Sequence, residues 1–267
     1  GTISGSGGLE LTGSGTQEFT GHNTYNGTTK VKSGAVLSAS SGNALGSSSS
    51  VTLDGGSLLI TRDPNNASNQ FQATVSFGAN GGQIQGNGTL KFSSTLNIGD
   101  KASIAAGESI GQLTFEGPVQ FGELGKLKVE IGNGSSSSEI IADSVLVSSL
   151  SITSTSSNPF SINLTGNDGN LPSNFSDATS RAWTIVKSNS TISTFDASKF
   201  NLSIASNLQT AGAQGQWSLS LGTSGTAASN NAIFLSFTPV PEPSTFLLFA
   251  MGLLFVFPQA SRRRRSS

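Results

Sequence analysis

The chain has no cysteine, one histidine and one methionine, and only 11% of its 267 residues are charged. Without cysteine it can form neither disulfides nor cysteine-based metal sites. A Ser-His-Asp arrangement could be built only around His22, which stands beside Asn23 and which we interpret as an exposed turn residue. We therefore expect a protein that is not an enzyme and that holds no metal ion and no cofactor.

A strong excess of positive charge is also missing. The last 28 residues hold four of the 14 basic residues and one of the 15 acidic ones, so residues 1–239 carry ten basic and 14 acidic side chains. Nucleic-acid binding depends on clustered Lys and Arg, which neutralise phosphates. We expect no nucleic acid among the partners.

Short apolar runs recur throughout residues 1–150, each opened by a glycine and built from alternating apolar and polar residues. The leading glycines are Gly8, Gly34, Gly56, Gly88, Gly111 and Gly125. Alternation with a period of two predicts short β-strands, and Gly, Asn or Asp between them can form the turns. The pattern indicates an all-β body.

One short strand of this kind cannot bury its own apolar face, but stacked coils can. Most intervals between the leading glycines fit one coil of a solenoid. We therefore predict a right-handed parallel β-helix over residues 1–150. A β-sandwich is the structural alternative, because hairpin strands show the same alternation.

The pattern changes in residues 151–239, where Ser, Asn, Gly and Asp separate longer apolar runs. These runs are Arg181–Val186, Phe200–Ile204, Gln216–Leu221 and Ala232–Phe237. In such strands Trp217, Leu219 and Leu221 share one face. We interpret this region as an antiparallel β cap over the open end of the solenoid, followed by a stalk.

Residues 9–37 resemble the autotransporter-associated β-strand repeat, and residues 103–131 resemble the closing coils of such proteins. The positions that match the repeat are Gly13, Gly15, Gly21, Asn23, Tyr25, Gly27, Thr28, Thr29, Val31, Gly34 and Leu37. The resemblance implies a parallel β-helix. Within it we expect Asn23 and Asn26 to form turns and Tyr25 to cover the edge of a coil.

The carboxyl-terminal stretch has three zones in a fixed order. A rigid opening consists of Val240, Pro241, Glu242, Pro243, Ser244 and Thr245. An apolar block of 12 residues follows, with Phe246, Leu247, Leu248, Phe249, Ala250, Met251, Gly252, Leu253, Leu254, Phe255, Val256 and Phe257. Four basic residues stand near the end: Arg262, Arg263, Arg264 and Arg265.

The apolar block alone is too short to cross a bilayer, but the charge-free stretch from Ser244 to Ser261 has 18 residues. As a helix it would cover roughly 27 Å, a marginal span that Pro258 would fray at its end. We predict one hydrophobic membrane helix here. Arginines beside such a helix stay on the cytoplasmic side, so the body would lie across the membrane.

The three zones resemble the PEP-CTERM sorting signal, with Pro258-Gln259 and the two final serines as departures. The resemblance implies handling by an exosortase, a membrane transpeptidase, in a Gram-negative-type cell. The prolines keep Val240 to Ser244 extended, as a processing enzyme would need. A simple membrane anchor on a proline-rich stalk and a terminal hydrophobic strand are the alternatives.

These features together predict an exported protein that passes through the inner membrane to the cell surface or extracellular matrix. We expect a structural or adhesin-like role, extracellular polysaccharide as a further partner, and an export signal upstream of Gly1 in the parent protein. A glycan-binding or polysaccharide-cleaving β-helix is the alternative. Its carboxylates would include Asp54, Asp63, Asp100 and Glu108, which share no place in the coil.

Two further readings stay open. The run Asn167–Asn170 has oxygens that suit calcium, but its Asp-Gly pair is also that of a hairpin turn, which we favour. An autotransporter passenger would require a membrane β-barrel after the passenger, whereas this chain continues into an apolar block and arginines.

Overall fold

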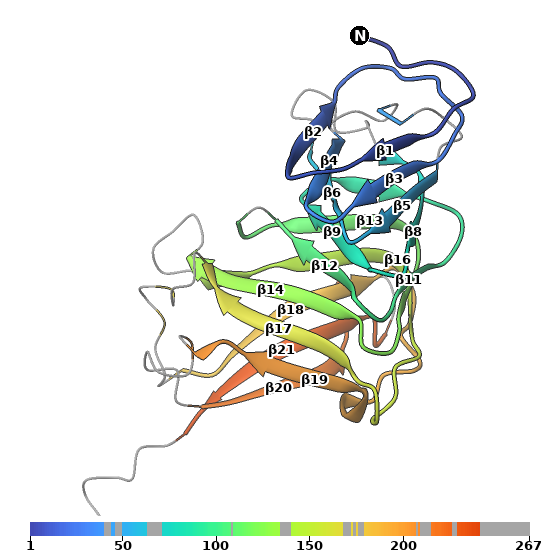
Figure 1. Cartoon of the computed structure of the whole chain (residues 1–267). Coiled ribbons are helices and arrows are strands. Elements are labelled where there is room, and N and C mark those ends of the chain that lie inside the picture. The colour runs from blue at the N-terminus through green and yellow to red at the C-terminus, as the bar shows by residue number, and fades with distance from the viewer. Residues whose placement is uncertain are drawn as a thin grey trace, which may run out of the picture.

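The computed structural model describes residues 1–39, 44–45, 50–62, 71–107, 109–133, 140–167, 172, 175, 179–206, 208, 215–225 and 229–240. Most of these residues lie in β-strands, and a short 3-10 helix, η2 (Ala197–Lys199), is inserted between two of them. The strands form three sheets that run along an elongated molecule (Figure 1). The prediction of an all-β body is confirmed.

The largest, nine-stranded sheet has the strand order β19-β17-β14-β12-β9-β6-β4-β2, with β15 beside β14. Its strands are β2 (Gly15–Phe19), β4 (Ala35–Ala39), β6 (Ser57–Ile60), β9 (Gly82–Gly86), β12 (Ala102–Ala106), β14 (Lys126–Asn133), β15 (Ile140–Ala142), β17 (Phe160–Gly166) and β19 (Phe200–Ile204). Every pair along this order is parallel. Only the short β15 pairs antiparallel in this sheet.

The eight-stranded sheet has the order β20-β21-β18-β16-β13-β10-β7, and β11 pairs with β13. Its strands are β7 (Phe71–Gln72), β10 (Thr89–Lys91), β11 (Leu96–Ile98), β13 (Gln112–Phe121), β16 (Ser144–Ile152), β18 (Arg181–Ser188), β20 (Gly215–Gly222) and β21 (Ala232–Pro239). The four-stranded sheet contains β1 (Leu9–Leu11), β3 (Thr29–Lys32), β5 (Ser50–Asp54) and β8 (Thr74–Phe77), all parallel.

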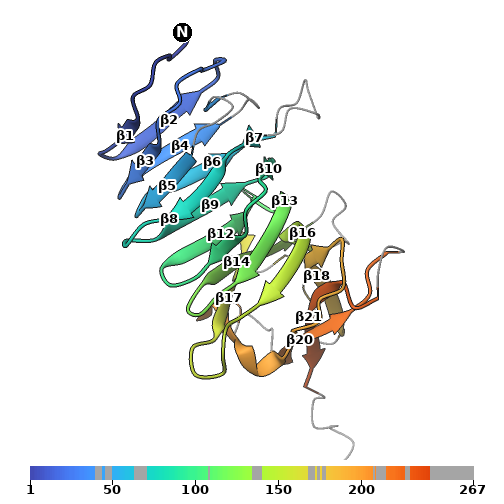
Figure 2. The same cartoon turned by 90° about the vertical axis from the view of Figure 1, so that its right-hand side faces the viewer.

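Successive passes of the chain add strands to each sheet in turn. Strands β5, β6 and β7 belong to three different sheets, and β8, β9 and β10 repeat the series (Figure 2). Side chains that meet on neighbouring passes are 22 residues apart at Thr28 and Ser50, and 32 apart at Gln112 and Ser144. Each pass is therefore one coil, which is compatible with a parallel β-helix.

The coils are in register, so equivalent side chains stack on one another. In the nine-stranded sheet an inward row of aliphatic residues pairs from strand to strand and is fully buried: Leu37, Leu58, Ile84, Ile104, Leu127 and Ile162. Burying one such side chain contributes about 1.5–3 kcal/mol. Because inward and outward positions alternate, the register that buries this row turns the polar residues between its members outward.

The leading glycines noted in the sequence each lie directly before a strand, and several are needed for close coil-to-coil approach. A Cβ atom added to Gly56 would lie 2.6 Å from the carbonyl oxygen of Lys32 on the preceding coil. A Cβ added to Gly8 would lie 2.6 Å from the carbonyl oxygen of Thr28. These contacts are shorter than any side chain tolerates, so the stacking distance itself requires glycine.

The carboxyl-terminal strands depart from the parallel pattern, as predicted. Strand β18 pairs antiparallel with β21, and β21 pairs antiparallel with β20. Trp217, Leu219 and Leu221 pair with Phe237, Leu235 and Ile233 in that order. Parallel pairing continues past residue 150, however, through β18 on β16 and β19 on β17.

The predicted carboxyl-terminal helix lies outside the described residues. Among the residues that are described, the structure contains no helix long and apolar enough to span a bilayer. The division of the body at residue 150 stays a prediction.

Candidate functional site

The sorting tail begins where the last strand ends. Strand β21 closes at Pro239, and Val240, the first position of the predicted motif, is 57% exposed. The rest of the motif, Pro241–Thr245, lies outside the described residues, as do the membrane segment Phe246–Phe257 and Arg262–Arg265. Only the attachment point of the tail is therefore placed, at an exposed strand end.

His22 and its neighbour Asn23 differ in exposure. His22 is exposed, as we interpreted it from the sequence. Its neighbour Asn23 is 2% exposed, accepts a hydrogen bond from the Ile3 N–H at 2.8 Å and donates one to the Ala44 carbonyl at 2.6 Å. Asn23 thus joins three successive coils instead of facing a ligand.

Tyr25 is also buried and does not cover an edge. Only 1% of its surface is exposed, and its hydroxyl lies 2.5 Å from Thr29 Oγ1. Burial raises the pKa of the phenol, and the hydrogen bond with Thr29 opposes the rise. The ring fills the interior, because its single polar atom finds a partner there.

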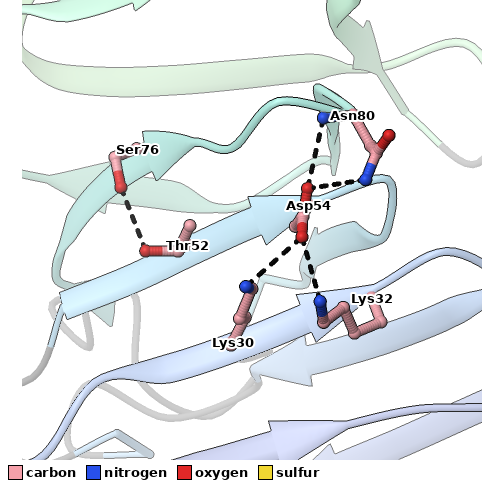
Figure 3. Close-up of polar contacts among 6 residues, drawn as sticks. All are labelled: Lys30, Lys32, Thr52, Asp54, Ser76 and Asn80. Carbon is pink, nitrogen blue, oxygen red and sulfur yellow. Dashed lines mark hydrogen bonds and ion pairs between the residues drawn. The ribbon is translucent and has the colours of Figure 1, made fainter.

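Asp54 is the centre of an ion-pair cluster on the four-stranded sheet (Figure 3). Its Oδ2 lies 3.1 Å from Lys32 Nζ and 3.4 Å from Lys30 Nζ on the preceding coil. Its Oδ1 accepts hydrogen bonds from the backbone N–H of Asn80, at 3.2 Å, and from its Nδ2, at 2.9 Å, on the following coil. Beside the cluster the hydroxyls of Thr52 and Ser76 lie 3.2 Å apart.

The Asp54 cluster has a structural explanation. The hydrogen bond from Lys32 and that from the Asn80 N–H lower the pKa of Asp54 to about 2, so the carboxylate stays ionised. Its partners lie on two neighbouring coils, and it therefore links three layers of the stack. The other carboxylates weighed in the sequence do not join it, since Asp100 lies in an exposed turn and Asp63 and Glu108 are outside the described residues.

A groove of about 610 Å³ crosses the outward face of the nine-stranded sheet. It is lined by Gln83, Gln85, Ala105, Ala106, Gly107, Lys128, Glu130, Asp143, Asn163 and Thr165. These residues come mainly from β9, β12, β14 and β17, which lie one beside another in Figure 1. The groove therefore runs across the strands, along the stack of coils.

The groove is hollow because the middle strand carries small side chains. Strand β12 contributes Ala105 and Ala106, with Gly107 directly after it, whereas β9 on one side presents glutamines and β14 on the other presents Lys128 and Glu130. Ala105 pairs with Gln85 and with Lys128 across the two ladders. Longer side chains thus stand on both sides of a low floor.

The walls are linked by a polar network over this floor. Lys128 Nζ donates a hydrogen bond of 2.6 Å to Gln83 Oε1, and Gln83 Nε2 donates one to Gln85 Oε1. The hydroxyl of Ser103 donates to the Gly82 carbonyl at 3.4 Å. The network holds amide and ammonium donors in place without burying them.

Asp143 lines the groove and is 2% exposed. Its Oδ1 accepts from the Gly111 N–H and its Oδ2 from the Glu130 N–H, both at 2.8 Å. Burial raises the pKa of Asp143 to about 7, the nearby charge of Glu130 adds to the rise, and the two amide hydrogen bonds oppose it. A carboxyl group that titrates near neutrality therefore borders an open polar groove.

Sequence reasoning missed this groove. The alternation in Gln83–Gln85 and Lys126–Glu130 does show that these side chains face outward. Their meeting depends on the pairing of β9, β12 and β14, which no local pattern reveals. Within the described part of the chain, the structure holds no group of three or more His, Asp or Glu residues that could bind a metal ion.

The comparisons with known proteins concern the tail. Residues 239–265 match the PEP-CTERM protein-sorting motif. No curated protein matches the chain. The motif confirms the part of the prediction that rests on the three zones, and it indicates an exported protein that passes through the membrane and is processed by an exosortase.

Proposed function

We propose that the protein is an exosortase substrate whose body is a right-handed parallel β-helix with a structural or adhesin-like role at the cell surface or in the extracellular matrix. The observation that carries the proposal is the PEP-CTERM motif at residues 239–265, which follows directly on the last strand of a stacked β body. Export and membrane passage follow from the motif. The final location of the protein and the role of its body go beyond the motif and are part of the proposal.

The position of the tail suits cleavage by a membrane transpeptidase. Strand β21 lies next to the edge strand β20 and ends at Pro239, and the exposed Val240 leads into the Pro-Glu-Pro segment. Because Pro241 and Pro243 lack N–H groups, this segment cannot extend the sheet. The apolar block would then insert as one membrane helix, and the arginines would hold it in the membrane with the body outside.

The body suits a structural role because two of its carboxylates form hydrogen bonds that hold neighbouring coils or strands together. Asp54 links three coils, and Asp143 ties β13 to β14 through two backbone N–H groups. The match of residues 9–37 to the autotransporter-associated repeat supports a β-helix at the level of resemblance. A stack of coils can extend by repetition, which fits a scaffold or adhesin. We propose no catalytic role.

The test is made in cells that carry the exosortase. The parent protein receives an epitope in the body, and wild type is compared with Glu242→Ala and with a variant in which Arg262–Arg265 are all serine. The expected result is accumulation of uncleaved, membrane-retained protein for Glu242→Ala and loss of correct orientation for the arginine variant. Glu18→Ala, an exposed glutamate on β2, is the matched control and should behave as wild type.

Deletion of the exosortase should reproduce the defect of the Glu242→Ala variant in the wild-type protein. Unchanged mass, location and membrane retention in both tail variants would contradict the proposal.

A further inference from the structure

We propose that the groove across β9, β12, β14 and β17 is a binding site for a neutral polysaccharide chain, which lies along the stack of coils. The site extends the proposed function by naming where the body would hold its matrix partner. Its test is a binding measurement on the purified protein. Failure of binding is therefore distinguishable from failure of sorting, which is measured in cells.

The lining fits a ligand rich in hydroxyl groups. Gln83, Gln85 and Asn163 offer both amide donors and carbonyl acceptors, and Thr165 offers a hydroxyl. The described lining contains no aromatic ring and no aliphatic side chain larger than alanine. Pockets for compact drug-like ligands are mostly apolar. A groove of about 610 Å³ with this lining instead favours a hydrated ligand held by hydrogen bonds.

The register of the strands favours a polymer. Gln85, Ala105, Lys128 and Asn163 pair with one another from strand to strand and form one outward row. Gln83, Ser103, Lys126 and Ser161 form the row beside it. Neighbouring strands lie roughly 4.8 Å apart, which is about the length of one sugar ring. The polar groups of the two rows therefore follow this spacing along the groove, with Ala105 as a gap in the first row. A chain with a regular repeat could use several of them at once.

The charges favour a neutral chain. Lys128 is the one basic side chain in the described lining, and Glu130 and Asp143 lie near it. Residues 1–239 as a whole carry ten basic and 14 acidic side chains. An acidic polysaccharide would therefore be repelled by the Glu130 carboxylate in the groove and by the net negative charge of the body, whereas a neutral polysaccharide would not be repelled by either.

The test uses the full chain, purified in a mild non-ionic detergent because of its apolar tail. Affinity gel electrophoresis measures retardation by laminarin, hydroxyethylcellulose, dextran and glucomannan as neutral polymers and by alginate as an acidic one. We expect retardation by at least one neutral polymer and none by alginate. Retardation by alginate alone, or by no neutral polymer, would overturn the proposal.

Two variants then locate the site. In the double variant Gln83→Ala/Gln85→Ala, loss of several hydrogen bonds should weaken binding at least about tenfold. In Ala105→Trp, the ring should fill the floor of the groove and abolish binding while every polar side chain remains. All three positions face outward, so the thermal unfolding of each variant should stay close to that of wild type.

Matched controls lie on the eight-stranded sheet. Gln112→Ala/Gln120→Ala removes two outward glutamines of β13, and Ser151→Trp adds a ring at an exposed position of β16. Both controls should bind as wild type. Equal loss of binding in the controls and the groove variants would overturn the assignment of the site. Release of new reducing ends from the polymer would show cleavage and would overturn the proposal of a binding site without catalysis.

Discussion

The rings of Phe121 and Phe160 lie 4.2 Å apart and are inclined by only 9°, so they are stacked face to face. Phe121 ends β13 in the eight-stranded sheet, and Phe160 begins β17 in the nine-stranded sheet. Both side chains are fully buried. The pair therefore joins two sheets in the interior of the stack.

Replacing Phe160 by alanine should lower the free energy of unfolding by about 3–5 kcal/mol, because it removes a buried ring and leaves a cavity beside Phe121 and Phe200. Urea unfolding followed by circular dichroism measures the change. Val240→Ala, at an exposed position, is the control and should change stability by less than about 0.5 kcal/mol. A similar loss in both variants would contradict the packing role.

Asn23→Ala should destabilise the amino-terminal coils. The variant leaves the Ile3 N–H and the Ala44 carbonyl without their partner, and an unsatisfied buried group costs about 1–3 kcal/mol. Hydrogen exchange of the Ile3 amide is the direct measurement and should become faster. Asn26→Ala, with an exposed side chain, should leave this exchange unchanged, and slow exchange of Ile3 in both variants would refute the role of Asn23.

Asp54 should make the protein sensitive to acid. Its pKa in the folded protein, about 2, is below the ordinary 3.8 because Lys32 and the Asn80 N–H favour the ionised form. The stabilisation is therefore complete above the ordinary pKa and is lost as the pH falls through about 2. Melting temperatures between pH 6 and about 2 should fall less steeply for Asp54→Asn than for wild type. Thr52→Ala, which removes a neighbouring hydroxyl and no charge, should keep the wild-type slope.

Asp143 should make the protein less stable as the pH rises. Burial raises its pKa to about 7, so the folded protein keeps a proton that the unfolded chain releases above 3.8. Stability should therefore fall as the pH rises from about 4 to about 7, and Asp143→Asn should flatten this dependence. Glu130→Gln removes the neighbouring negative charge, which helps to raise the pKa of Asp143. In this variant the loss of stability between about pH 4 and pH 7 should therefore be smaller than in wild type. Identical pH profiles for Asp143→Asn and wild type would contradict the assignment.

Local patterns were sufficient to predict many of the strands. The runs Arg181–Val186, Phe200–Ile204, Gln216–Leu221 and Ala232–Phe237 all lie in strands, because alternation and β-branched or aromatic residues are local signals. The direction of the strands, parallel or antiparallel, was harder to predict from the sequence. Strand β19, at Phe200–Ile204, pairs parallel with β17 and not as part of an antiparallel cap, since strand direction depends on where the preceding loop leads.

Polar residues were harder to interpret from sequence. Asn23 and Tyr25 have the residue types of turn and edge positions, but both are buried. Their polar atoms find partners on other coils or within the same turn, which makes burial possible. Whether a polar side chain is exposed thus depends on partners distant in sequence.

The order of zones in residues 240–265 and the alternation of the body were determined by the sequence itself, because sorting chemistry and strand faces depend on neighbouring residues. The tertiary structure decided which outward side chains meet. Gln85, Ala105, Lys128 and Asn163 are far apart in the chain, and only the register of four parallel strands brings them into one row. A groove on a stack of coils is a property of that register.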